Sequence, residues 1–469
     1  MIEWLSVFKN GKSKSGQVEP SLEELELSAI EAEQARQKNR EILLLEREWK
    51  KLTYDHLLER IDVRALNNLP AAQAREQIGT ICRKMLDDSE TPLSESSRER
   101  VLKQLENDVL GLGPLEELLG DDSISDIMVN GSQQVYVERR GTLELTHVVF
   151  DDDQHLMKII ERIVSMVGRR LDEQSPMVDA RLKDGSRVNV IIPPLALDGP
   201  MMSIRRFTVE KLDMANLIEF GSLNSAIARV LEVIVKLRLN VLISGGTGSG
   251  KTTLLNILSG FIPASERIVT IEDSAELQLQ QPHVVRLETR PPDLEGRGEV
   301  TQRELVKNSL RMRPDRIVIG EVRGAEVMDM LQAMSTGHDG SLATIHGNTP
   351  RDALGRVENM IALAGFVIPL AALRHHITSA IDIVVQTQRL EDGSRRVTSI
   401  QEIDGMEGDM ITMAEIFRFE QSGVDENGKV IGDYYSTGIV PNFYNRLKAR
   451  GMELDINVFR EGEDREWNG

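Results

Sequence analysis

Residues 240–259 read NVLISGGTGSGKTTLLNILS, and this stretch decides the fold of the second half of the chain. The apolar run 240–244 is typical of a buried strand, residues 245–252 fit the pattern G-x-x-x-x-G-K-[ST], and residues 253–258 continue as a helix. Glycines let the backbone curl so that successive N–H groups point inward, where they and the N-terminus of the following helix attract phosphate oxygens. The stretch therefore predicts a strand, a phosphate-binding loop and a helix, in that order.

The same loop predicts ATP and Mg²⁺ as cofactors. Lys251 supplies a positive charge for the β and γ phosphates, and Thr252 offers its hydroxyl to Mg²⁺. The residues that we expect to bind the nucleotide here are Gly245, Gly246, Thr247, Gly248, Ser249, Gly250, Lys251, Thr252 and Thr253.

Apolar runs alternate with helical stretches on both sides of this loop. Such alternation predicts an α/β fold with a parallel sheet and helices on both of its faces. The predicted strands are 240–244, 268–271, 284–287, 316–319, 341–345 and 381–385. Beyond them, residues 386–419 read as antiparallel ribbons around the turn Asp392-Gly393.

Two acidic groups follow predicted strands. Glu321 ends the run 316–321, so we expect it to coordinate Mg²⁺ through water and to activate the attacking water. Glu272, Asp273 and Glu276 follow the strand 268–271, and their carboxylates are expected at the same edge of the sheet, Glu272 and Glu276 as catalytic groups and Asp273 as a metal ligand. An ordinary helix N-terminus also attracts acids, which is the competing interpretation of this second cluster.

Two histidines frame the strand 341–345. His346 ends it, where it would lie near the γ-phosphate, and His338 precedes it; we expect both to be catalytic. His375 and His376 lie in a helical stretch without an acidic partner, and we interpret them as surface or core residues.

The composition limits the classes of function. The chain has 469 residues, enough for about three domains, with 56 Lys+Arg against 75 Asp+Glu and a net charge of −19. This acidity disfavours nucleic acid as a partner. A single cysteine, Cys82, excludes an internal disulfide and a tetracysteine zinc site. No run approaches the ~18 apolar residues of a membrane-spanning helix, so we expect a cytoplasmic protein with only peripheral membrane contact.

Composition shifts divide the chain into predicted regions. Gly111-Leu112-Gly113-Pro114 ends a long helical pattern, and short alternating runs follow it. The regions are a tail at 1–20, a helical region at 21–110, a small α+β domain at 111–207, a linker at 208–222, the ATP-binding domain at 223–440 and a C-terminal tail at 441–469.

Taken together, these motifs resemble those of the secretion ATPase superfamily, whose members serve type II secretion, type IV pili and type IV secretion. Further segments are similar to the CpaF-type ATPases of tight-adherence pili, and the resemblance covers about residues 100–420. These segments are 111–115, 170–173, 193–200, 203–207, 287–292 and 311–316.

The resemblance implies a homohexameric ring in which the α+β domain closes on a RecA-like motor domain. It also implies a cytoplasmic motor at the inner membrane of a bacterium, docked on polytopic platform proteins, that moves pilin subunits. In such rings arginines of the N-terminal domain and linker help to hold nucleotide, which makes Arg187, Arg205 and Arg206 the candidates here. Many type II members carry a tetracysteine zinc module, which this chain lacks.

Two other functions remain open from the sequence. One is a nucleotide-gated switch or scaffold that turns ATP over too slowly to do work. The other is a nucleic-acid motor, because helicases share the RecA-like core, although the chain has no basic run of five or more residues.

Overall fold

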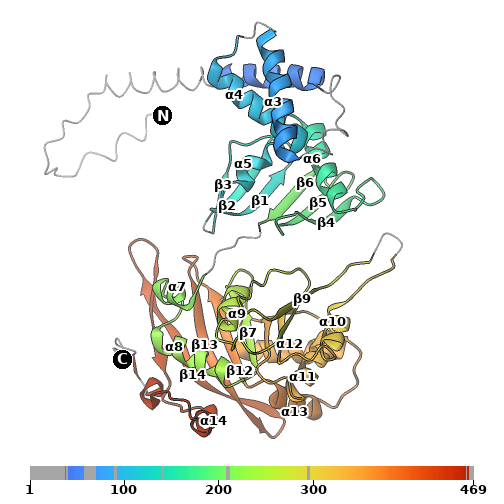
Figure 1. Cartoon of the computed structure of the whole chain (residues 1–469). Coiled ribbons are helices and arrows are strands. Elements are labelled where there is room, and N and C mark those ends of the chain that lie inside the picture. Colours follow the sequence, from blue (N-terminus) through green and yellow to red (C-terminus); the bar gives the residue numbers. More distant parts are fainter. Residues whose placement is uncertain are drawn as a thin grey trace, which may run out of the picture. The chain divides into compact units, whose positions relative to one another are not determined.

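The structure is a computed structural model, and it describes residues 37, 41–57, 70–88, 92–139, 141–206, 212–292, 296–460 and 462–463. The chain divides into two units, Met1–Thr208 and Val209–Gly469, called unit 1 and unit 2 below. Figure 1 shows both units with most of their elements labelled. The tail predicted at 1–20 lies outside the described residues.

The first part of unit 1 is helical. It consists of residues 41–57, α3 (Ala71–Asp88) and α4 (Glu95–Leu110). Ser94 starts α4 because its side chain accepts the N–H of Ser97. The three segments share one apolar core, in which Leu57, Ile78 and Leu105 are buried. The described residues between 41 and 110 thus form the helices that the sequence predicts.

The second part of unit 1 is an antiparallel sheet of six strands in the order β3-β2-β1-β6-β5-β4. Apolar residues of the five strands other than β3 form one core with α6, whose Leu156, Ile159 and Ile163 are buried, whereas the residues of β3 are exposed. The elements are α5 (Leu115–Leu119), β1 (Ile124–Asn130), β2 (Val135–Arg139), β3 (Thr142–Leu145), α6 (Asp153–Met166), β4 (Met177–Arg181), β5 (Arg187–Ile191) and β6 (Met201–Arg205).

Unit 2 is built on a sheet of ten strands in the order β16-β15-β14-β13-β12-β7-β11-β10-β8-β9. The six strands from β12 to β9 are parallel. These strands are β7 (Val241–Gly245), β8 (Ile268–Glu272), β9 (Val284–Glu288), β10 (Arg316–Val322), β11 (Leu342–His346) and β12 (Ile383–Arg389).

Helices cover both faces of this parallel sheet. Val241 and Ile243 of β7 belong to one apolar core, which includes α8 and α9, whereas Leu242 belongs to a second core with α11, α12 and α13. Neighbouring residues of a strand face opposite sides, so the two cores lie on opposite faces. The prediction of an α/β fold is confirmed. The helices are α8 (Ser225–Lys236), α9 (Lys251–Ser259), α10 (Gln302–Ser309), α11 (Glu326–Ser335), α12 (Pro350–Leu363) and α13 (Leu370–Ala380).

The strands beyond β12 are antiparallel, as the sequence predicts. They are β13 (Arg395–Glu407), β14 (Met410–Val424), β15 (Val430–Ser436) and β16 (Gly462–Glu463). Because β13 pairs with β12, these ribbons extend the parallel sheet, which the sequence does not reveal.

Two regions of unit 2 differ from the expectation that they are a linker and a tail. The range 208–222 contains α7 (Met214–Glu219), which begins with a capping box between Asp213 and Asn216. The range 441–469 contains α14 (Phe443–Ala449) and the 3₁₀ helix η2 (Ile456–Phe459). Leu217, Phe443 and Phe459 are buried in the same core as α8 and α9. Apolar side chains thus tie both ranges to unit 2, although their overall composition is polar.

The described part of the chain holds no helix with the length and apolar content needed to cross a membrane.

Candidate functional site

The loop between β7 and α9 has the conformation of a phosphate-binding loop. Gly248 and Gly250 have φ values of 68° and 93°, a left-handed conformation that glycine adopts without steric cost. No side chain caps the start of α9 at Gly250, so the first N–H groups of the helix are not covered by a cap. Strand, loop and helix follow one another as the sequence predicts, and the loop can receive an anion at the helix N-terminus.

Lys251 is held inside this loop by backbone oxygens. Its ammonium group donates to the carbonyl oxygens of Gly245 and Gly246 at 3.0 and 2.9 Å. Burial lowers the pKa of Lys251 below its ordinary value, and the carboxylate of Glu321 acts in the opposite direction. The cation and the acid are therefore close enough to influence one another.

The predicted residues that follow β-strands do meet at one edge of the parallel sheet. His346 ends β11 in register with Gly245, the last residue of β7. Glu272 ends β8, and Glu321 lies near the end of β10, which pairs with both β8 and β11. The phosphate-binding loop, two acids and one histidine thus share the carboxyl edge of the sheet.

Glu272 is buried and fixed by the backbone. One carboxylate oxygen accepts the N–H groups of Glu276 and Leu277 at 2.7 and 2.9 Å. The other oxygen, Oε1, is buried without a hydrogen-bond partner among the described residues. Burial raises the pKa of Glu272 to about 7. A carboxyl group of this kind can accept a proton near neutral pH.

The interpretation of the second acidic cluster as a helix N-terminus is wrong. Residues 273–283, all described, form no helix. Glu276 contributes its backbone N–H to the orientation of Glu272.

Arg323 joins Glu321 to Asp273. Its guanidinium donates to Oε2 of Glu321 through Nε at 2.8 Å and also through Nη2. Nη1 of the same side chain lies 3.6 Å from a carboxylate oxygen of Asp273. Asp273 and Glu321 therefore both lie within reach of one guanidinium.

His338 requires a correction. It lies in the loop before β11, where Ser341 donates its hydroxyl to the His338 carbonyl oxygen at 2.7 Å, so it is at the amino edge of the sheet. The five residues of β11, at about 3.3 Å each, separate it from His346. His338 therefore cannot reach a nucleotide bound by the loop of the same chain. His375 and His376 are exposed on α13, as expected of surface residues.

The three candidate arginines lie in unit 1. Arg206 donates to the carbonyl oxygens of Leu119, at 2.8 Å, and Asp121, so it holds the segment between α5 and β1. Arg187 and Arg205 are paired in register on β5 and β6, both exposed, and Arg205 contacts Asp126 at 3.1 Å. Arg206 thus has a role within its own unit, whereas Arg187 and Arg205 present their side chains at the surface.

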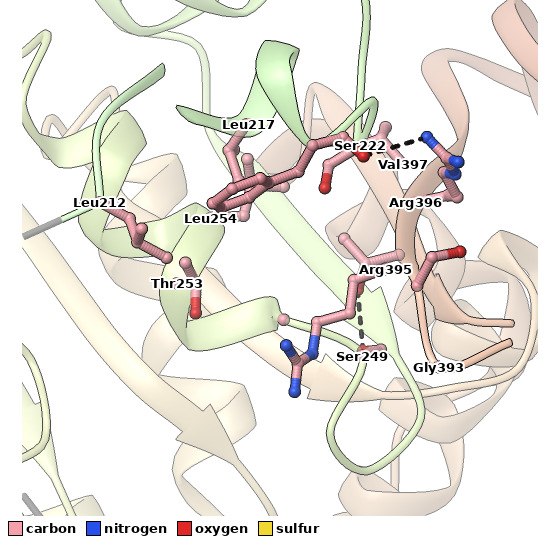
Figure 2. Close-up of a pocket in the computed structure, with 14 residues that line it drawn as sticks. Leu212, Leu217, Ser222, Ser249, Thr253, Leu254, Gly393, Arg395, Arg396 and Val397 are labelled. Atoms are coloured by element: carbon pink, nitrogen blue, oxygen red, sulfur yellow. Dashed lines mark hydrogen bonds between the residues drawn. The ribbon is translucent and has the colours of Figure 1, made fainter. Parts of the chain in front are cut away.

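A cavity of about 280 Å³ opens beside the phosphate-binding loop, and sequence reasoning missed it. Figure 2 shows Leu212, Leu217, Leu254 and Val397 along its wall, with Ser249 on the loop and Thr253 in the first turn of α9. Arg395 reaches from β13 across the loop, where its Nε donates to the Gly248 carbonyl oxygen at 2.9 Å. More than a hundred residues separate these segments, so no local pattern indicates that they meet.

The residues present fit a magnesium nucleotide. The hydroxyl of Thr252 and the carboxylates of Glu321 and Asp273 are oxygen donors, which Mg²⁺ prefers. The uncapped start of α9 and the unpaired Oε1 of Glu272 are polar groups directed at the same edge. The apolar cavity beside the loop has room for the nucleoside part of the ligand.

Comparison with known proteins gives a consistent result. A sequence model described as "Type II/IV secretion system protein" matches residues 108–415. A candidate conjugal transfer protein of Mycobacterium tuberculosis is 39% identical over 313 residues, 66% of this chain and 88% of that protein. The type IV secretion system protein VirB11 of Bartonella quintana is 33% identical over 62% of this chain and 91% of its own length. The crystal structure of the VirB11 ATPase of Brucella suis, in complex with sulphate, aligns with a TM-score of 0.34 and 25% identity, covering 62% of this chain and 95% of that one.

Proposed function

The chain belongs to the type II/IV secretion system protein family, and from this premise we propose that it is a motor ATPase that hydrolyses Mg-ATP to drive the assembly, the retraction or both of a pilus, or a related secretion process. The observation that carries the proposal is the meeting of the phosphate-binding loop with Glu272, Glu321 and His346 at one edge of the sheet.

Each of these groups has a separate task in ATP hydrolysis. The loop amides and Lys251 bind the phosphates, and Thr252, Glu321 and Asp273 hold Mg²⁺. Bound Mg²⁺ neutralises charge on the phosphate oxygens. Glu272 accepts the proton of the attacking water, which its pKa of about 7 permits near neutral pH. His346 lies beside the first residue of the loop, where it senses the terminal phosphate.

A motor can do mechanical work only if the rate of ATP hydrolysis depends on the position of another domain. An arginine that approaches the γ-phosphate can accelerate hydrolysis by about 10³ to 10⁵. In the rings that this chain resembles, arginines of the N-terminal domain help to hold nucleotide, and Arg187 and Arg205 are exposed on unit 1. We assign them this role, within a homohexameric ring.

The finer assignment is to the CpaF-type ATPases of tight-adherence pili. It rests on the motifs quoted above, and the matched relatives named as a type IV secretion system protein and as a conjugal transfer protein support a role in secretion or transfer. We propose that the protein acts at the cytoplasmic face of the inner membrane on polytopic platform proteins.

Purified protein tests the proposal. Lys251→Ala should abolish binding of a fluorescent ATP analogue, because the loop loses its cation, whereas Lys429→Ala, an exposed lysine of the β14–β15 turn, should bind as the wild type does. Glu321→Gln should bind nucleotide but lose at least about 10²-fold in turnover. Glu407→Gln, at an exposed carboxylate on β13, is its matched control.

One outcome would contradict the role of Glu321, and two others would contradict the motor. Wild-type turnover by Glu321→Gln would remove Glu321 from catalysis. Binding of ATP by the wild type without hydrolysis would favour a switch or scaffold. Salt-dependent binding of DNA that accelerates hydrolysis would favour a nucleic-acid motor.

A further inference from the structure

Arg323 is the first residue after β10, and its guanidinium lies among acidic side chains. It donates to the carboxylate of Glu321 through two nitrogens and lies 3.6 Å from that of Asp273. The charge of Glu276 also acts on it. A single side chain thus balances three acids at the edge of the sheet where the phosphate-binding loop lies.

The main chain of Arg323 is held firmly, although its side chain is 58% exposed. Glu326 begins α11, and its Oε1 accepts the N–H groups of Arg323 and Gly324 at 2.6 and 2.7 Å. Glu326 itself is buried. The guanidinium can therefore leave the acids by rotation of its own side chain, with no movement of the backbone and no opening of the core.

The contacts of Arg323 involve the same carboxylates that we expect Mg²⁺ to use. Glu321 and Asp273 are the carboxylates that fit the metal, directly or through its water. Two N–H groups of the guanidinium donate to one oxygen of Glu321, Oε2, which is therefore occupied while Arg323 holds it. The two cations therefore compete for Glu321.

We propose that Arg323 is a positioning residue that holds Glu321 and Asp273 for Mg²⁺ and yields them when the magnesium nucleotide binds. The inference rests on the proposed function, since it assigns the regulation of that same site. With the arginine present, the charge of the acids is neutralised, so they do not repel a nucleotide that arrives without metal. When Mg²⁺ arrives, it must displace the guanidinium of Arg323 from the carboxylates. Removal of the arginine should therefore weaken the binding of nucleotide without metal and should not weaken its binding with Mg²⁺.

The test compares the affinity for a fluorescent ADP analogue in EDTA and in saturating Mg²⁺. In Arg323→Gln we expect weaker binding in EDTA, because the acids are no longer neutralised, and unchanged or tighter binding in Mg²⁺. The dissociation constant in EDTA divided by the dissociation constant in Mg²⁺ should rise by about fivefold or more. Arg323→Lys keeps the charge but cannot bridge two carboxylates, so its ratio should lie between those of the wild type and the glutamine variant.

Arg418→Gln is the matched control, because Arg418 contacts Glu420 two residues along β14, at 2.5 Å, at the same spacing in the chain, although in the reverse order, and far along the chain from the loop. Its ratio should equal that of the wild type. If Arg323 had only a structural role, Arg323→Gln would weaken the affinities in EDTA and in Mg²⁺ equally and leave their ratio unchanged. This result would overturn the inference but not the proposed function, because the wild-type protein would still bind nucleotide. If the wild type binds no analogue in either buffer, the proposed function fails as well.

Discussion

Gly320 and Glu272 are in contact across two strands: a Cβ atom placed on Gly320 would lie 2.9 Å from Cγ of Glu272. They follow the paired residues Ile319 and Ile271 of β10 and β8. The missing side chain of one residue thus makes the space that the buried carboxylate of the other occupies. Glu272 is held from one side by this glycine and from the other by two backbone N–H groups.

Gly320→Ala should therefore disturb Glu272. The added methyl group overpacks a buried strand, which costs about 1–3 kcal/mol in the free energy of unfolding, and it displaces the carboxylate. We expect ATP turnover to fall by about tenfold or more, since small displacements of catalytic groups have effects of that size. Steady-state ATPase assays and chemical denaturation measure the two effects. Gly423→Ala is the control, because a Cβ on this glycine of β14 meets no atom within 4 Å.

The pKa of Glu272, raised by burial to about 7, predicts the pH dependence of the reaction. If the carboxylate accepts the proton of water, turnover should increase as pH rises through about 7, and Glu272→Gln should lose this dependence together with at least about 10²-fold in rate. Glu407→Gln should keep the wild-type profile. A profile in Glu272→Gln that still rises through pH 7 would assign the base to another group.

The same shift has a consequence for stability. The pKa of Glu272 is higher in the folded chain than the ordinary 4.5, so the folded state binds the proton more tightly, and stability falls as pH rises from about 4.5 to about 7. Glu272→Gln does not ionise. The free energy of unfolding of this variant minus that of the wild type should therefore increase by on the order of 3 kcal/mol between pH 4.5 and pH 8. Chemical denaturation of both proteins at each pH measures this difference.

Lys50 is predicted to hold the helical residues 41–57 to the rest of unit 1. Its ammonium lies 2.8 Å from Asp108 of α4 and 2.9 Å from Asp151, and only 7% of its side chain is exposed. Burial alone would lower the pKa of Lys50, but the two acids raise it, so the lysine stays charged. Lys50→Met leaves Asp108 buried with one cation fewer, which should destabilise unit 1 by on the order of 3 kcal/mol.

Thermal unfolding of the full chain measures this loss. Lys103→Met, on the exposed side of α4, should leave the midpoint temperature of unfolding unchanged. If the midpoint temperature is also unchanged in Lys50→Met, His155, which lies 3.4 Å from Asp108, would balance the charge of this aspartate without the lysine.

The sequence alone determines the elements that depend on neighbouring residues. Residues 240–259 specify their strand, loop and helix because the required glycines, the lysine and the apolar run are contiguous. The direction of parallel strands then places Glu272, Glu321 and His346 at one edge, since each follows a predicted strand. The same rule places His338 at the opposite edge, because it precedes its strand.

Only the tertiary structure decides which distant segments meet. Arg395 contacts Gly248 because β12 pairs with β7 and the chain then turns back in β13, a pairing between residues about 140 positions apart. Lys50, Asp108 and Asp151 come from three segments that no local pattern joins. The burial that raises the pKa of Glu272 likewise comes from packing around it. Periodicity and motifs record interactions within a few residues, whereas burial, charge pairing and cavities arise only when segments pack together.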